Sequence, residues 1–188
     1  MRLHSILHGS RANGPNLRSV VWVQGCVGIG CAGCVNPATH DPNGGTEIDL
    51  DDLVQELLYK SVPGTEGLTL SGGEPLQQSW DVLDLIGEIK TLKPDWSIGM
   101  FTGYARSELC DIPIWTAIRA TLDFAVFGRY DRTKPCNLPL TSSWNQELVL
   151  LSNRYSLTDF GPQTEEVHIG PDGLFVITGF PVKSSFDS

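Results

Sequence analysis

The stretch that decides the fold is residues 20–34, VVWVQGCVGIGCAGC. It begins with four apolar residues, three of them β-branched, and no polar residue alternates with them. Such a run is typical of a strand buried on both faces of a parallel sheet. A glycine-rich loop with three cysteines follows directly. Similar apolar runs at 68–70, 98–101 and 122–127 predict three more buried strands.

Helical periodicity fills the intervals between these runs. Apolar residues between 50 and 58 repeat at helical spacing after Asp49, a good N-cap residue, and a second stripe spans 82–89. Pro113 is expected to split residues 106–120 into two short helices. Strands and helices therefore alternate, which is the pattern of right-handed βαβ units.

We predict an α/β fold, specifically a partial, open (βα) barrel with a mainly parallel sheet, because four parallel strands are too few to close a barrel of about eight. Residues 166–169 and 174–177 flank the turn 170–173 and predict a C-terminal β-hairpin in an extension of about 164–179. Residues 133–145, rich in Pro, Ser, Thr and Asn, are expected to be a long loop. We expect one domain over 1–188, with a core of about 13–155.

Composition narrows the class of protein. The 188 residues carry a net charge of −9, which argues against binding to nucleic acid or to an anionic membrane. No apolar run approaches the roughly 20 residues that span a bilayer, and the N-terminus lacks the apolar core of a signal peptide. The sequence therefore predicts a cytoplasmic protein without membrane or nucleic-acid partners.

The cysteines indicate a metal or redox site. Three of the five, Cys26, Cys31 and Cys34, fall within nine residues, and an odd total without an export signal argues against a disulfide framework. An iron–sulfur cluster, a Cys₃His zinc site completed by His40, and a redox dithiol all fit this spacing. The isolated Cys110 and Cys136 are expected only to pack.

A second motif, Ser71-Gly72-Gly73-Glu74-Pro75, follows the second predicted strand. Glycines let a ligand approach the backbone, and a carboxylate can accept a hydrogen bond from an ammonium group. Alone, the motif also fits an ordinary strand-to-helix turn. Together with the three-cysteine loop one strand earlier, it leads us to expect that the two glycines serve a ligand rather than the fold.

Together, the two motifs resemble those of the radical S-adenosylmethionine (SAM) superfamily, and most closely its activating enzymes, such as the anaerobic ribonucleotide reductase activating proteins. The resemblance spans about residues 13–155. Its pieces are 13–15, 22–26, 31–37, 70–75, 101–104, 128–130 and 142–146. The family usually has three residues between its first two cysteines, whereas this chain has four, 27–30.

The resemblance implies the site residues. Cys26, Cys31 and Cys34 would ligate one 4Fe-4S cluster, SAM would chelate the fourth iron, and no further catalytic residue is implied. The implied cofactor contacts are Gly33, Cys34 and Val35 at the adenine; Gly72, Gly73 and Glu74 at the methionyl ammonium, with Ser71 in the same motif; and Thr102 and Arg129 near the methionyl or ribose end.

The implied activity is reductive cleavage of SAM to a 5′-deoxyadenosyl radical, with an electron from flavodoxin or ferredoxin. The implied partner is a glycyl-radical enzyme, from which the radical would remove a glycine Cα hydrogen. One alternative is a radical SAM enzyme acting on a small molecule or peptide, with the C-terminal hairpin capping a private pocket. Another is a zinc-binding structural or interaction module without catalysis.

Overall fold

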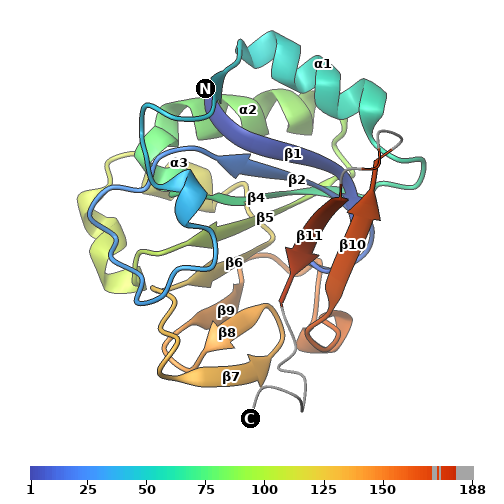
Figure 1. Cartoon of the computed structure of the whole chain (residues 1–188). Coiled ribbons are helices and arrows are strands. Elements are labelled where there is room, and N and C mark those ends of the chain that lie inside the picture. Colours follow the sequence, from blue (N-terminus) through green and yellow to red (C-terminus); the bar gives the residue numbers. More distant parts are fainter. Residues whose placement is uncertain (171–172, 174, 181–188) are drawn as a thin grey trace.

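A central sheet has the strand order β3-β1-β2-β4-β5-β6-β9 in this computed structural model, which describes residues 1–170, 173 and 175–180 (Figure 1). Its strands are β1 (Arg2–Ser10), β2 (Arg18–Val23), β3 (Thr46–Glu47), β4 (Gly67–Gly72), β5 (Ser97–Thr102), β6 (Phe124–Phe127) and β9 (Glu147–Leu150). β2, β4, β5 and β6 are the four predicted strands and are parallel, whereas β1, β3 and β9 add antiparallel edges. β3 and β9 are the two ends of the strand order.

The predicted helices are also present. The helices are α1 (Leu50–Lys60), α2 (Ser79–Leu92) and α3 (Trp115–Arg119), with short 3-10 helices η1 (Pro37–Thr39), η2 (Pro75–Gln78), η3 (Arg106–Asp111) and η4 (Leu157–Asp159). Asp49 caps α1, because its side chain accepts a hydrogen bond from the Asp51 amide at 2.9 Å. Pro113 separates η3 from α3, as expected.

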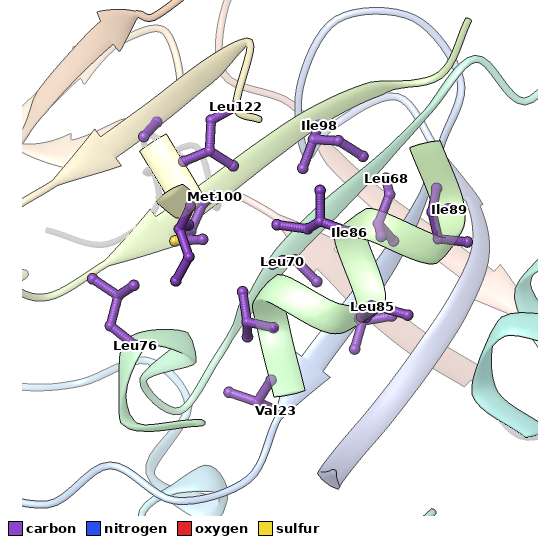
Figure 2. Packing of buried hydrophobic residues seen from close by; sticks show 14 of the residues in the cluster. Val23, Leu68, Leu70, Leu76, Leu85, Ile86, Ile89, Ile98, Met100 and Leu122 are labelled. Atoms are coloured by element: carbon purple, nitrogen blue, oxygen red, sulfur yellow. The ribbon is translucent and has the colours of Figure 1, made fainter. Parts of the chain in front are cut away.

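Alternation along the strands divides the core between the two faces of the sheet. On one face, α2 lays Leu85, Ile86 and Ile89 over buried side chains of β4 and β5, namely Leu68, Leu70, Ile98 and Met100 (Figure 2). On the other face, Phe124 and Val126 of β6 pack with Leu140 and Phe160. The parallel strands are therefore buried on both faces, as their unbroken apolar runs require.

A fully buried arginine ties the amino ends of the parallel strands together. Arg18 uses all five N–H groups: Nε donates to Thr69 Oγ1 (2.8 Å), Nη1 to Pro15 O (3.1 Å) and Ser97 Oγ (2.8 Å), and Nη2 to Leu68 O (2.9 Å) and Ser97 O (3.1 Å). The guanidinium also lies 5.0 Å from the centre of the Phe124 ring. Burial lowers its pKa to about 10, so Arg18 stays cationic at neutral pH.

Among the described residues, two small two-stranded sheets stand apart from the central sheet. The predicted hairpin is confirmed as antiparallel β10 (Glu165–Ile169) and β11 (Phe175–Gly179), although Pro171, Asp172 and Leu174 of the prediction lie outside the described residues. The loop predicted for 133–145 is wrong, because β7 (Pro135–Leu138) pairs there with β8 (Thr141–Ser143). The polar composition of residues 133–145 led to the wrong prediction, because backbone pairing between β7 and β8 forms the sheet and Cys136 and Leu140 are buried.

Within the described residues, no helix has the length and apolar character needed to cross a bilayer.

Candidate iron–sulfur and SAM site

The expected site residues gather at one end of the sheet. The cysteine loop leaves β2, the Gly-Gly-Glu motif leaves β4, Thr102 ends β5 and Arg129 follows β6 (Figure 1). These strands are parallel neighbours, so their carboxyl ends lie side by side. This is the edge at which parallel α/β folds place their ligands.

Backbone contacts hold the cysteine loop at both ends. Before it, the Gly25 and Cys26 amides donate to Thr39 O (2.8 Å) and His40 O (3.1 Å). After its first cysteine, the Gln77 side-chain amide pairs with the backbone of Val27, accepting from its N–H (2.9 Å) and donating to its carbonyl (2.6 Å).

The far end of the loop is tied to the segment that follows β6. Ala32 forms a parallel bridge with Asp131, and the Arg132 amide donates to Ala32 O at 3.0 Å. Gly33 adopts φ +80°, and a side chain there would overlap that of Arg132. Val35 lies 72% exposed, so the residues expected at the adenine lie at the surface.

The electrostatics of the thiols fit a cationic metal centre. Burial, together with the smaller effect of negative charge on Glu74, Cys31 and Cys34, raises the pKa of Cys26 to about 11. Burial also raises the pKa of Cys31. Cys26 and Cys31 therefore favour the neutral thiol until bound iron supplies a compensating positive charge.

The geometry does not bring ligands together around one ion. Among the described residues, no three His, Cys, Asp or Glu side chains form a group that could hold a single metal ion, and the His40 side chain is exposed. A Cys₃His zinc site needs four ligands around one ion. In a 4Fe-4S cluster each thiolate instead binds a different iron, so the three cysteines need not converge on one point.

The two glycines of the second motif are required by the fold, which corrects the expectation that they serve only a ligand. Gly72 has φ +104°, and an added Cβ would come within 2.5 Å of the Val23 amide. A Cβ on Gly73 would overlap the Gly25 carbonyl. The Gly73 and Glu74 amides donate to Val23 O and Gly25 O, both at 2.8 Å. The motif thus packs directly against the chain leading into Cys26.

Glu74 is a fully buried carboxylate at the centre of the site. Its Oε1 accepts from Leu76 N (3.0 Å) and Thr102 Oγ1 (2.9 Å), and its Oε2 accepts from Gly103 N (2.8 Å). Burial outweighs these bonds and raises its pKa to about 7. A carboxylate oxygen has two acceptor positions. Among the described contacts, Oε2 keeps one open, which suits an ammonium group.

An apolar residue that the sequence did not single out packs near this carboxylate, against Gly103. Ile29 of the cysteine loop is buried and packs against Gly103, where an added Cβ would overlap it. Gly28 (φ +75°) and Gly30 (φ +72°) flank it, and open space surrounds both. Ile29 therefore lies beside Gly103, whose amide binds Glu74, and the two flanking glycines give this part of the loop conformational freedom. The sequence signal that could have identified Ile29 is its position as a large apolar residue between two glycines.

Arg129, expected near the methionyl or ribose end of SAM, binds Glu108 and the cysteine loop in the structure. Its two Nη groups donate to the Glu108 carboxylate at 2.7 and 2.9 Å, and its Nε donates to Ile29 O at 2.6 Å. The guanidinium holds the pKa of Glu108 well below its usual value, at about 2. The structure thus joins Arg129 to the cysteine loop through Ile29. Ser71 is half-buried near the end of β4. Nothing in the sequence motifs pointed to Glu108.

Comparison with known proteins agrees with this arrangement. Residues 12–149 match the family described as "4Fe-4S single cluster domain". The chain is 32% identical over 134 residues to the anaerobic ribonucleoside-triphosphate reductase-activating protein of Vibrio cholerae, covering 69% of this chain and 84% of the relative. The protein of that name from Enterobacteria phage T4 is 28% identical over 138 residues, covering 72% and 85%.

A shorter match extends to a second kind of activating protein. The pyruvate formate-lyase-activating enzyme of Clostridium pasteurianum is 39% identical over 89 residues, which cover 45% of this chain and 37% of that enzyme.

The fold and the site together define an iron–sulfur enzyme of the radical SAM class, whose cofactors are a 4Fe-4S cluster and SAM. The chain belongs to the 4Fe-4S single-cluster domain family, within the activating-enzyme branch of that class.

Proposed function

We propose that this chain activates a glycyl-radical enzyme of the anaerobic ribonucleotide reductase type by removing a hydrogen atom from a glycine Cα. The observation that carries the proposal is the extent of the match: the chain covers 84% and 85% of two relatives named as reductase-activating proteins. The shared region, residues 12–149 by family match, holds the cysteine loop, the Gly-Gly-Glu motif, Thr102 and Arg129.

When bound and reduced by an external donor, a 4Fe-4S cluster would supply the one electron for reductive cleavage of SAM to methionine and a deoxyadenosyl radical, which would take the hydrogen atom. In this chain, Cys26, Cys31 and Cys34 would each hold one iron and leave the fourth iron to SAM. Glu74 would accept from the methionyl ammonium through the open position on Oε2.

The remaining residues would position these groups. Thr102 and the Gly103 amide hold the Glu74 carboxylate in one orientation. Gly33 and Val35 offer exposed backbone to the adenine. Arg129 would act through the Ile29 carbonyl, and a direct contact with the ribose would require it to leave Glu108.

A protein substrate suits the placement of the C-terminal hairpin. β10 and β11 pack near the turn between β1 and β2, which is the amino end of β2, and they lie across the sheet from the cysteine loop (Figure 1). In the part of the chain that the structure describes, the hairpin leaves the cysteine loop uncovered, which supports a large partner over a private pocket capped by the hairpin.

The remaining expectations belong to the same proposal. We propose one domain over 1–188, with the seven-stranded sheet acting as the partial, open barrel of the class. We also propose a cytoplasmic enzyme that takes its electron from a flavodoxin or ferredoxin and has no nucleic-acid or membrane partner.

Electron paramagnetic resonance tests the function. Anaerobically reduced, cluster-loaded protein is mixed with SAM and a candidate glycyl-radical enzyme, and a glycyl doublet on that partner is the expected result. The matched controls are Cys31→Ala in this chain and replacement of the partner's radical glycine by alanine, each of which should abolish the doublet. Deoxyadenosine formation stimulated only by a small molecule or peptide would overturn the proposal, and a colourless zinc-loaded protein would overturn the class.

A further inference from the structure

An exposed tryptophan, Trp144, lies on an ordered turn between β8 and β9. The Gln146 side chain accepts hydrogen bonds from the Ser142 and Ser143 amides at 2.9 and 3.2 Å, and the Gln146 amide donates to Ser143 O at 2.9 Å. These bonds fix the backbone of the turn, while the Trp144 side chain is 67% exposed. Residues 142–146 belong to the family resemblance, but the cluster and SAM site gives them no role.

Backbone contacts join this turn to the cysteine loop through residues 128–134. This segment leaves the carboxyl end of β6 and leads to β7 (Figure 1). The Trp144 amide donates to Lys134 O at 2.8 Å, and Asp131 of the same segment forms the bridge with Ala32. Trp144 is therefore held at a fixed place relative to the three cysteines, by its backbone rather than by its side chain.

The connecting segment is basic although the chain is acidic. Residues 128–134 carry three basic side chains and one acidic side chain, in a chain of net charge −9. Two of the basic side chains are paired with carboxylates, at 2.7 and 3.0 Å. The third, Arg132, is exposed and forms no ion pair within the described part of the chain. Its side chain lies against Gly33 of the cysteine loop, where it offers a positive charge to an approaching carboxylate.

We propose that Trp144 and Arg132 form the docking surface for the protein substrate, with the indole entering an apolar recess on that protein and the guanidinium pairing with a carboxylate at the rim of the recess. This inference rests on the proposed function and names the recognition surface of the same site. A tryptophan side chain supplies a large apolar contact at a small cost in conformational entropy, and such residues dominate the binding energy of many interfaces. The planar fork of an arginine binds a carboxylate through two hydrogen bonds.

The substrate protein suits this surface better than an electron donor does. Transfer of a hydrogen atom requires the glycine Cα to be held within about 3–3.5 Å of the reacting atom, and therefore a partner bound in one register. Electron-transfer encounters are weak and bury little surface. A fixed apolar anchor beside the cysteines supplies the single register that the first kind of partner needs.

Anaerobic binding and activation assays test the proposal. Cluster-loaded protein is titrated against an immobilised candidate glycyl-radical enzyme by interferometry, and the glycyl doublet on the same partner is followed by electron paramagnetic resonance. Dithionite is the reductant, so that no protein donor takes part. Trp144→Ala should raise both the dissociation constant and the half-saturating concentration of the partner at least about tenfold. Its iron content and its dissociation constant for SAM should equal those of the wild type, and Trp144→Phe should recover part of the lost affinity.

The chain offers matched controls for both side chains. Tyr59 is 83% exposed in the last turn of α1, so Tyr59→Ala should leave partner binding unchanged. Arg132→Ala should weaken partner binding by a factor that shrinks as salt is added, because salt screens an exposed ion pair. Arg119→Ala removes an exposed arginine of α3 and should have no such effect.

Docking and function fail in different ways. If the wild type forms the glycyl radical and Trp144→Ala does so at an unchanged half-saturating concentration, the docking surface is wrong and the function stands. If Trp144→Ala weakens binding to a partner on which the wild type forms no glycyl radical, the function is wrong and the docking surface stands. A wild type that neither binds nor activates a reductase-type partner overturns both. Loss of iron from Trp144→Ala in proportion to its loss of partner binding would assign Trp144 to the fold and overturn the docking surface.

Discussion

The buried carboxylate of Glu74 makes the stability of the cluster-free protein depend on pH. Its pKa is raised from 4.5 to about 7 by burial, so the folded state binds the proton more tightly than the unfolded state does. A group of this kind contributes stability that is fully present below the unfolded pKa and is lost as pH rises through the folded pKa. The difference between the two pKa values corresponds to about 3 kcal/mol, most of it lost between pH 5 and pH 8.

Glu74→Gln removes this titration and should flatten that part of the pH dependence. At pH 5 the variant should be less stable than the wild type by about 1–3 kcal/mol, because the side-chain amide cannot accept from both Thr102 and Gly103 without placing a donor against a donor. At pH 8 the wild type has lost the proton-linked stabilisation, so the two proteins should converge.

Urea unfolding of the chelated apoprotein at pH 5 and pH 8 measures both effects. The matched control is Glu88→Gln, which alters an exposed carboxylate on α2 and should leave the pH dependence of the wild type unchanged. If the difference between wild type and Glu74→Gln is the same at both pH values, the reasoning about the buried carboxylate is wrong. SAM, by placing a cation beside the same oxygen, should bind more tightly as pH rises through 7.

Three further predictions concern the cysteine loop. Replacing any one of its three cysteines by alanine should abolish iron–sulfur absorbance and SAM cleavage, whereas Cys110→Ala with Cys136→Ala should retain both; the reverse outcome would refute the ligand assignment. Gly73→Ala should lower the free energy of unfolding by about 1–3 kcal/mol and reduce bound iron, because the added Cβ overlaps the Gly25 carbonyl. Urea unfolding measures the change in stability. The control is Gly87→Ala, which lies in open space on α2 and should be neutral or stabilising. Gln77→Ala should speed iron loss to a chelator, since two hydrogen bonds to the loop disappear; an unchanged rate would show that they do not hold it.

The parallel core was predictable because its signals are local. The apolar runs of β2, β4, β5 and β6 mark strands buried on both faces, and the stripe beginning at Leu50 marks an amphipathic helix. The antiparallel strands gave weaker signals. β1 mixes His4, Ser5 and His8 with apolar residues, because it is paired in the sheet but only partly buried. β9 has four residues, too few for a periodicity to show.

The site was predictable at the level of motifs and not at the level of contacts. The cysteine spacing and the Gly-Gly-Glu motif located the ligand end of the sheet, but the overlap of Gly73 with Gly25 depends on how closely β2 and β4 approach. The contact between Ile29 and Gly103, and the ion pair of Arg129 with Glu108, join segments distant in sequence. No local pattern encodes such pairs, so only the three-dimensional structure reveals them.

The anchored cysteine loop bears on how such proteins can be found from sequence. Residues 27–30 leave the body between two fixed points, the Gln77–Val27 pair and the Ala32–Asp131 bridge, and Gly28 and Gly30 within them face open space. An insertion between those points lengthens the loop without displacing the contacts that fix either of its ends. A search pattern that requires three residues between the first two cysteines would reject this chain for a difference that its framework absorbs. A pattern built on the anchoring residues would admit it, and would remain indifferent to loop length.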